Sequence, residues 1–268
     1  MRTNHRTVEA VEKSSGAEFE ITTLEQRPDL EDQLEKLHEG TWDEFLNGAP
    51  WNYWETLFDT FANFQILLVQ NGDELIGAGH TVPLDWNGKI DDLPRLLDDV
   101  IRRGLMAAEE GLPWTTLSAL AAMVPDKHQK RGLSTEIIKA MRALAARHGF
   151  HSVVVPVGPT LKHLYPLTPM ERYAQWKRED GSPFDPWIRV HWKLGAEQLC
   201  VNPQTALVNG TVAQWEEWTG MKFPESGLYI VPGALSPVEI DRDRDVGRYD
   251  DPGLWMRHHV PKERPPQG

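Results

Sequence analysis

A short segment between a strand pattern and a helix pattern has the residue types of an anion-binding loop. Residues 115–124 are an apolar run of strand length, ended by Pro125, which cannot donate a ladder hydrogen bond. From Ser134 the apolar residues recur with helical period, and Gly149 stands at the expected helix end. The basic loop between them therefore leads directly into a helix N-terminus. Unpaired backbone N–H groups and the positive end of the helix dipole meet there, which suits a phosphate or a pyrophosphate.

Two common phosphate-binding signatures are absent from the sequence. It contains no G-x-x-x-x-G-K-[ST] motif, and the Gly-x-Gly at Gly77 leads into residues 80–83, which end in a proline and do not open a helix. The loop Gln129-Lys130-Arg131-Gly132-Leu133-Ser134 instead resembles the acyl-CoA loop of the GNAT superfamily of acyltransferases, whose pattern is Gln/Arg-x-x-Gly-x-Gly/Ala. Ser134 departs from the usual last residue but is small. An ordinary strand-to-helix turn is the alternative interpretation.

The resemblance implies a coenzyme A site on both sides of Pro125. Pantetheine would pair along the end of the central strand, and pyrophosphate would bind the loop amides, with added charge from Lys130 and Arg131. The implied cosubstrate is an acyl-CoA, with acetyl-CoA as the first choice. The residues implied in binding it are Ala122, Met123, Val124, Gln129, Lys130, Arg131, Gly132, Leu133 and Ser134.

A histidine later in the chain has a position suited to proton transfer. Residues 185–196 indicate a short helix closed by Gly195. In many GNAT enzymes the helix here ends in Tyr-x-x-x-Gly-Phe, and that Tyr protonates the departing CoA thiolate. The residue four before Gly195 is His191, and an imidazolium could do the same near neutral pH. A packed core histidine is the alternative.

Three further motifs resemble a narrower group, the GNAT-like loading domains of some polyketide synthases. They are Pro159-Thr160-x-Lys162, Phe184-Asp185-Pro186-Trp187 and Arg189-x-His191. The resemblance implies that Thr160 and His191 face the thioester. It also implies decarboxylation of malonyl-CoA or transfer of the acyl group to an acyl carrier protein. No clear counterpart exists for an arginine that would hold a malonyl carboxylate.

Composition limits the class of protein and its partners. The formal net charge of −12 disfavours nucleic acid and anionic membranes as partners. A single cysteine, the lack of a membrane-length apolar run and the lack of a signal-peptide pattern predict a cytoplasmic protein. We expect no metal site, because the histidines lack carboxylate or cysteine partners at ligand spacing.

Apolar periodicity and turn residues predict an α/β chain. The predicted order matches the GNAT fold, a mixed central β-sheet flanked by helices on both faces. The predicted strands are 19–24, 65–70, 74–82, 115–124, 152–155, 197–201 and 227–232. The predicted helices are 30–38, 51–61, 94–110, 134–148, 185–195 and 211–220. The predicted domain organisation is a disordered arm 1–17, a GNAT-like domain 18–235 with an inserted loop 156–186, and a C-terminal extension 236–268.

The inserted loop is rich in proline, aromatic and basic residues, so we expect an ordered wall over the site. Its basic part, 162–178, is a predicted docking surface for an acidic acyl carrier protein, through Lys162, Arg172, Lys177 and Arg178. The leading hypothesis is transfer of an acyl group from acyl-CoA to an amine, thiol or carrier-protein acceptor. Two alternatives stay open: a malonyl-CoA decarboxylase that loads a carrier protein, and a catalytically silent CoA-binding protein.

Overall fold

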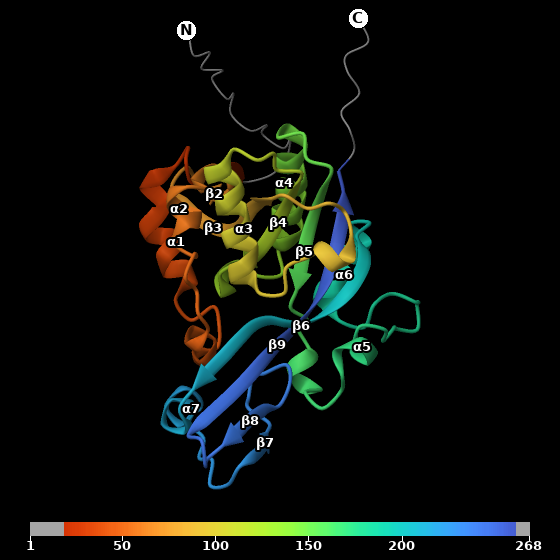
Figure 1. The fold of residues 1–268 in the computed structure, drawn as a ribbon. Coiled ribbons are helices and arrows are strands. Elements are labelled where there is room, and N and C mark those ends of the chain that lie inside the picture. The colour runs from red at the N-terminus through yellow and green to blue at the C-terminus, as the bar shows by residue number, and fades with distance from the viewer. Residues whose placement is uncertain (1–18, 261–268) are drawn as a thin grey trace, which may run out of the picture.

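The computed structural model describes residues 19–260 and shows one large sheet with helices on both faces (Figure 1). The predicted arm, residues 1–17, lies outside the described part of the chain. The strands are β1 (Phe19–Thr23), β2 (Ile66–Gln70), β3 (Glu74–Leu84), β4 (Thr116–Met123), β5 (Ser152–Val157), β6 (Glu197–Gly210), β7 (Gly227–Tyr229), β8 (Val238–Asp241) and β9 (Val246–His259). The helices are α1 (Glu31–His38), α2 (Thr56–Asp59), α3 (Leu97–Glu110), α4 (Leu133–Arg147), α5 (Met170–Tyr173), α6 (Pro186–Lys193) and α7 (Val212–Thr219).

The sheet is mixed, as the sequence predicted. Its strand order is β1-β2-β3-β4-β5-β9-β8-β7, and β6 pairs with β9 outside that path. Strands β4 and β5 pair in parallel, whereas the other neighbouring strands pair antiparallel. A parallel pair needs a crossover connection, and α4 supplies it between β4 and β5. The predicted α/β class, with helices on both sheet faces, is confirmed.

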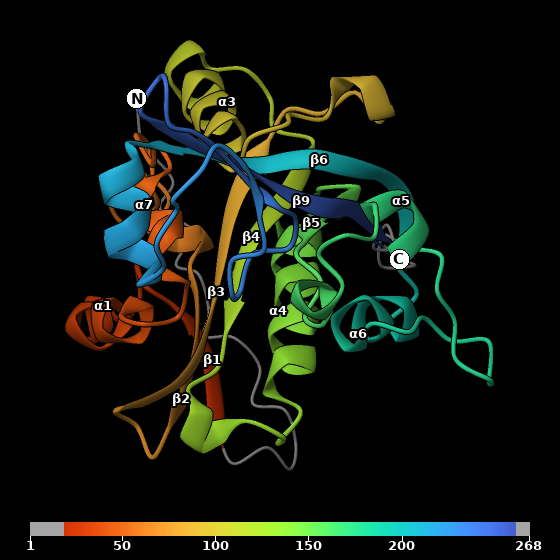
Figure 2. The same ribbon diagram turned by 90° about the horizontal axis from the view of Figure 1, so that it is seen from below.

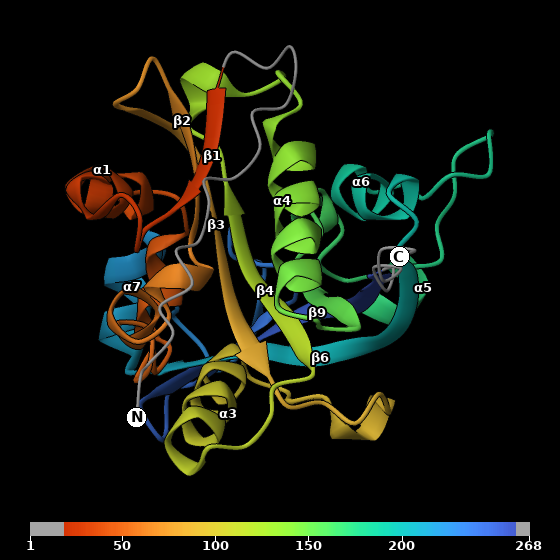
Figure 3. The same ribbon diagram turned by 90° about the horizontal axis from the view of Figure 1, so that it is seen from above.

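Helices α1 and α4 lie on opposite faces of strands β1 to β4 (Figures 2 and 3). The apolar stripe of α4 packs into the main core, and Gly79 of β3 lets it approach closely. A Cβ added at Gly79 would lie 2.6 Å from Ile137 and 2.8 Å from Met141, both on α4. This explains the Gly-x-Gly of β3 as a packing feature.

Strand β9 joins the main sheet to a smaller second core. One half pairs with β5 and the other half with β8, while β6 runs along its opposite edge. The second core surrounds Trp215 of α7, at the end of the β6/β9 ribbon that lies away from β5 (Figure 1). The segment 236–259, predicted as part of an extension, is therefore integral to the sheet. Pro252 is tolerated in β9 because it faces a register shift in β6, where no ladder N–H is needed.

Two other predicted elements differ in length. The predicted helix over 51–61 shortens to α2, because the backbone N–H of Tyr53 donates to Asp98 of α3 and the preceding residues form turns. The predicted strand 197–201 lengthens to Glu197–Gly210, since its pairing with β9 continues past Pro203. In both cases tertiary partners override the local pattern.

Candidate active site

The predicted anion-binding loop has the backbone conformation that its sequence implies. Lys130 and Gly132 have left-handed backbones, with φ of 63° and 79°, and α4 begins at Leu133. Within residues 19–260, the N–H groups of Lys130, Gly132, Leu133 and Ser134 have no backbone or side-chain acceptor. These groups converge at the N-terminus of a helix of 15 residues. The loop therefore keeps its donors available to an anion.

Beside this loop, strands β4 and β5 separate. Their parallel pairing comprises only Leu117 with Val153 and Ser118 with Val154, although β4 continues along β3 to Met123. The edge of β4 that would face β5 is thus unpaired from Ala119 onward. Of the three residues predicted to pair with pantetheine, Ala122 and Met123 lie in this splayed part, and Val124 directly follows it.

A bulge lies at the start of the splay. Ala119 pairs with Thr81 and Ala121 pairs with His80, so Leu120 is an extra residue on β4 with no partner on β3. A bulge re-aims the side chains around it and interrupts the ladder. Leu120 is only half-buried, and it lines a pocket on the sheet face that carries α1.

This pocket, which we call the tryptophan pocket, has a volume of about 310 Å³. Its aromatic walls come from the segment between α1 and α2, and its floor comes from β4, β6 and β9. It is lined by Trp42, Leu46, Asn47, Trp51, Trp54, Glu55, Leu97, Leu120, Ala206 and Asp251. Aromatic faces and carboxylates together favour a ligand that carries positive charge.

Asp251 is the acidic group that the tryptophan pocket holds most firmly. Its carboxylate accepts hydrogen bonds from the Tyr249 hydroxyl at 2.6 Å and from the Thr205 hydroxyl at 2.8 Å. Burial raises the pKa of the Asp251 carboxyl, whereas the hydrogen bonds from Tyr249 and Thr205 favour the charged form; nearby Asp43 raises the pKa further. A cation in the pocket would relieve this desolvation cost and would bring the pKa down.

His191 does not have the environment of a cationic proton donor. It lies in α6 with 1% of its surface exposed, and its Nδ1 is 2.9 Å from Nε2 of His258 on β9. Burial and the neighbouring His258 lower the pKa of His191 to about 3. The predicted imidazolium is therefore neutral at physiological pH, and the packed core histidine is the better interpretation.

Thr160 and His191 lie at different ends of α6. The backbone N–H of Leu161, next to Thr160, donates to Asp185 at the N-terminus of that helix. His191 comes six residues after Asp185, which corresponds to roughly 9 Å along a helix axis. The side chain of Thr160 is exposed, and no contact joins it to His191 among the described residues. Their predicted joint action on a thioester has no support in this geometry.

The basic loop also differs from its prediction at one residue. Lys162 is 1% exposed, and its ammonium donates to the carbonyl groups of Tyr165 and Leu235. It therefore cannot take part in docking. Arg172, Lys177 and Arg178 are exposed.

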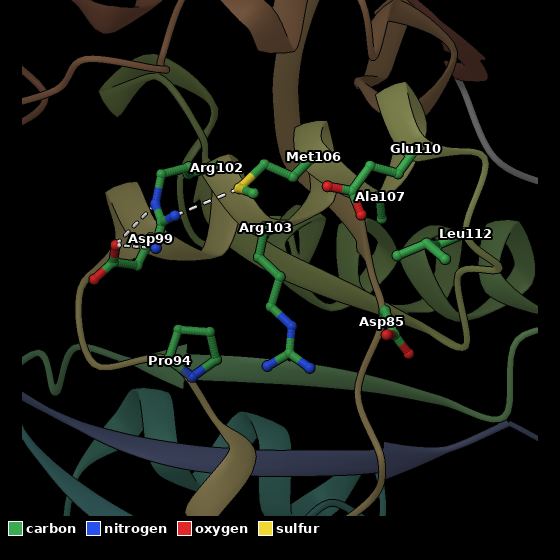
Figure 4. Close-up of a pocket in the computed structure, with 9 residues that line it drawn as sticks. All are labelled: Asp85, Pro94, Asp99, Arg102, Arg103, Met106, Ala107, Glu110 and Leu112. Atoms are coloured by element: carbon green, nitrogen blue, oxygen red, sulfur yellow. Dashed lines mark hydrogen bonds and ion pairs between the residues drawn. The ribbon is translucent and has the colours of Figure 1, made fainter.

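A separate pocket lies along α3 (Figure 4), and its volume is about 380 Å³. Both of its arginines are already paired: Arg102 with Asp99, and Arg103 with Asp92. Its lining shares no residue with the tryptophan pocket, with β4 or with the Gly132 loop. We therefore assign it no part in the candidate active site.

Residues 19–260 contain neither a metal-binding group nor a membrane-spanning helix. No group of three or more His, Cys, Asp or Glu side chains in that range is placed to hold a metal ion. No helix there is long and apolar enough to cross a membrane.

Sequence reasoning missed the residues of the tryptophan pocket. Trp51 and Trp54 look like the buried face of a helix in the sequence, and Asp251 falls within the predicted C-terminal extension. The unusual total of 11 Trp was the one available signal, but composition alone does not place a residue.

The antiparallel strands β1 to β4, the splay between β4 and β5, and the loop that opens α4 together define the GNAT fold. The structure is similar to the loading GNATL domain of CurA from Lyngbya majuscula, with a TM-score of 0.57, 18% identity, and coverage of 90% of this chain and 98% of that chain. It is also similar to the GphF GNAT-like decarboxylase in complex with isobutyryl-CoA, with a TM-score of 0.52, 16% identity, and coverage of 90% and 99%.

The sequence is similar to the arginine N-acetyltransferase avaD of Aspergillus versicolor. The identity is 29% over 276 residues, which cover 90% of this chain and 94% of that protein. No family model matches the sequence. The chain therefore has the GNAT fold that the Gln129–Ser134 loop implied, and its sequence is similar to that of an N-acetyltransferase, so the resemblance to GNAT acyltransferases is confirmed.

Proposed function

We propose that the protein transfers an acyl group from acyl-CoA to a nitrogen of a small cationic acceptor. The observation that carries the proposal is the position of the tryptophan pocket, which contains Leu120 of the β4 bulge and the carboxylate of Asp251. One end of the pocket thus adjoins the strand that would hold the thioester, while the other carboxylate, Glu55, and the indole rings attract a cation.

The donor side follows from the loop and the splay. The pyrophosphate of acyl-CoA fits the unpaired amides of Lys130, Gly132, Leu133 and Ser134, and its pantetheine fits the unpaired edge of β4. The thioester would then lie near Leu120. Acetyl-CoA is the first donor to test, since the named relative is an N-acetyltransferase.

The acceptor side favours arginine or a similar amine. The named relative acts on arginine, and the tryptophan pocket offers the chemistry that a guanidinium or ammonium group needs. The same carboxylates would repel the malonyl carboxylate of malonyl-CoA, so decarboxylation is not favoured.

Acyl transfer to a carrier protein is the second candidate. It is favoured by the exposed loop around α5, where Leu164 and Leu167 are 60% and 77% exposed. Lys177 and Arg178 in the same loop are exposed as well. Apolar and basic groups of this kind fit an acidic protein partner.

The test is a product assay with purified protein and acetyl-CoA. L-Arginine, agmatine, a neutral alcohol and a holo acyl carrier protein are offered separately, and products are identified by mass spectrometry. A parallel arm supplies malonyl-CoA and measures carbon dioxide release. We expect acetylated arginine or agmatine. Acylation of the carrier protein without acylation of any amine would overturn the proposal and favour the second candidate.

Gly132→Val should raise the dissociation constant for CoA at least tenfold. Valine would strain the left-handed backbone, and its side chain would occupy the space above the loop, where nothing lies within 4 Å of a Cβ. Isothermal titration calorimetry gives the constant directly.

Gly149→Val is the matched control for this variant. Gly149 follows the other end of α4 with φ of 72°, and a Cβ there also meets nothing within 4 Å. Both variants carry a similar backbone penalty, so equal loss of CoA affinity in the two would contradict the pyrophosphate assignment.

A further inference from the structure

A chain of three polar side chains lies beneath the tryptophan pocket. His38, the last residue of α1, has its Nε2 2.8 Å from Nε2 of His80 on β3. The Nδ1 of His80 is 2.9 Å from Oε1 of Gln65. His80 and Gln65 are both fully buried, while His38 is half-buried. His80 pairs with Ala121 of β4, directly after the Leu120 bulge.

The hydrogen bonds of Gln65 fix the tautomer of both imidazoles. Its Nε2 donates to two backbone carbonyls, of Phe61 and of Thr81, each at 2.9 Å. Its Oε1 must therefore face His80, so Nδ1 of His80 carries the proton and Nε2 accepts. His38 then donates from its own Nε2, and its Nδ1 is left with a free lone pair.

His38 also lines a second cavity, which we call the His38 pocket. It has a volume of about 270 Å³ and shares Trp54 and Glu55 with the tryptophan pocket. No described residue is bonded to Nδ1 of His38. Water in the His38 pocket can thus connect this nitrogen, past Glu55, with the acceptor site.

The surroundings hold His38 neutral. Burial lowers its pKa and lowers that of His80 to about 3. The titratable groups that face it are His80 from β3, Glu31 and Glu35 from α1, and Glu55 from the segment before α2. The remaining walls are the rings of Trp42, Trp54 and Phe58, which do not titrate.

We propose that His38 is the base that deprotonates the acceptor ammonium through water, and that His80 is a positioning residue. Because Nε2 of His80 accepts from Nε2 of His38, Nδ1 of His38 carries the lone pair that accepts the proton. This inference rests on the proposed function. The ammonium gives one proton to Nδ1 of His38, and the neutral amine attacks the thioester carbonyl carbon. The C–N bond forms and the C–S bond breaks, while a second nitrogen proton passes to the leaving thiolate. The imidazolium of His38 then releases its proton to solvent.

The base also selects the nitrogen that reacts. An α-amine with a pKa of about 8 is within reach of an imidazole, whereas a guanidinium with a pKa above about 12 has a neutral fraction at least about 10⁴-fold smaller. The reacting nitrogen is therefore an amine. A guanidinium serves only as the anchor beside Asp251.

The kinetic test uses His38→Ala and the pH dependence of kcat/KM with L-arginine and acetyl-CoA. Between pH 6.5 and 8 the wild type should change little, because His38 is already neutral and the ammonium is the substrate form. The variant should lose about 10²-fold at pH 6.5 and rise about tenfold per pH unit, following the free amine. Added imidazole should raise kcat/KM of the variant at least tenfold. Nα-acetylarginine should not be acylated.

Paired substitutions at His80 test its positioning role. His80→Gln retains an acceptor near the Nε2 position, whereas His80→Asn retains only the group that faces Gln65. We expect near wild-type kcat with His80→Gln and at least a tenfold loss with His80→Asn, with equal CoA affinity in both. Glu55→Gln removes a carboxylate that attracts the acceptor, so KM should rise, but the shape of the wild-type pH profile should be retained. Loss of the plateau in Glu55→Gln and not in His38→Ala would make Glu55 the base.

The tautomer is measured independently of turnover by ¹⁵N-edited NMR of the histidine side chains. An Nε2–H tautomer of His38 is expected, and an Nδ1–H tautomer would overturn the proposal. A flat profile in His38→Ala would overturn it as well. If the wild type acylates no amine at all, the proposed function fails and the base role fails with it, whereas the NMR result still shows whether the geometry was correctly inferred.

Discussion

Asp251→Asn should lower kcat/KM for a cationic acceptor by roughly 10- to 150-fold, which is the loss of one charge-assisted hydrogen bond of about 1.5–3 kcal/mol. The amide has the shape of the carboxylate, but its one oxygen can accept from only one of the Tyr249 and Thr205 hydroxyls, and it lacks the negative charge. The loss should appear mainly in KM, because the cation is bound equally in the ground state and in the transition state. Steady-state kinetics with L-arginine measures it.

Asp250→Asn is the control for this variant. Asp250 is the preceding residue of β9, so its side chain points to the opposite face of the sheet, where it pairs with Arg248. It should leave kcat/KM within about twofold, and CoA affinity should be unchanged in both variants. Equal kinetics of Asp251→Asn and wild type would show that the acceptor is held elsewhere.

Acid should unfold this protein over an unusually narrow pH range. Burial lowers the pKa of His80 and His191 to about 3 and that of His258 to about 4. Above pH 6.5 these imidazoles are neutral in both states, so their contribution to stability is complete. As the pH falls below about 6.5, these histidines become protonated in the unfolded chain, whereas in the folded chain they stay neutral until pH 3–4. Three such groups remove up to about 4 kcal/mol of unfolding free energy per pH unit.

Urea unfolding at pH 7.5, 6.0 and 5.0 measures the slope of the unfolding free energy against pH. Removing two of the three groups with His191→Gln and His258→Gln should lower stability at pH 7.5 but flatten the dependence to about one third. The raised pKa of Asp43 and Asp251 acts in the opposite direction near pH 4, where protonation of the folded state becomes easier. A wild-type slope that corresponds to the uptake of less than one proton on unfolding would contradict the burial of these histidines as neutral groups.

The donor side of the site could be predicted from sequence because its signals are local. The apolar run 115–124, the loop Gln129–Ser134 and the helical pattern from Ser134 follow one another directly in the sequence. The left-handed backbone of Gly132 agrees with this type of loop. Local patterns also predicted the strands 65–70 and 74–82 and the helix 211–220, which correspond to β2, β3 and α7.

The acceptor side could not be predicted, because it is assembled by long-range pairing. Trp54, Leu120 and Asp251 are separated by more than 60 residues at each step, and only the bulge of β4 and the position of β9 bring them together. The same strand explains why the surroundings of His191 could not be predicted from the sequence. Its neutral state depends on His258, in a segment whose prolines, glycines and aspartates conceal a strand.

The position of β9 affects how the chain must fold during synthesis. The strand is synthesised after β5, β6 and β8, yet it supplies the partner edge of all three. Until residues 246–259 emerge, the nascent chain exposes the unpaired edge of β5 and both apolar cores remain open. The sheet therefore cannot be completed before β9 has been synthesised, and the incomplete chain should be a substrate for chaperones. A premature stop that removes β9 should yield aggregated protein, whereas a tag added after residue 260 should be tolerated.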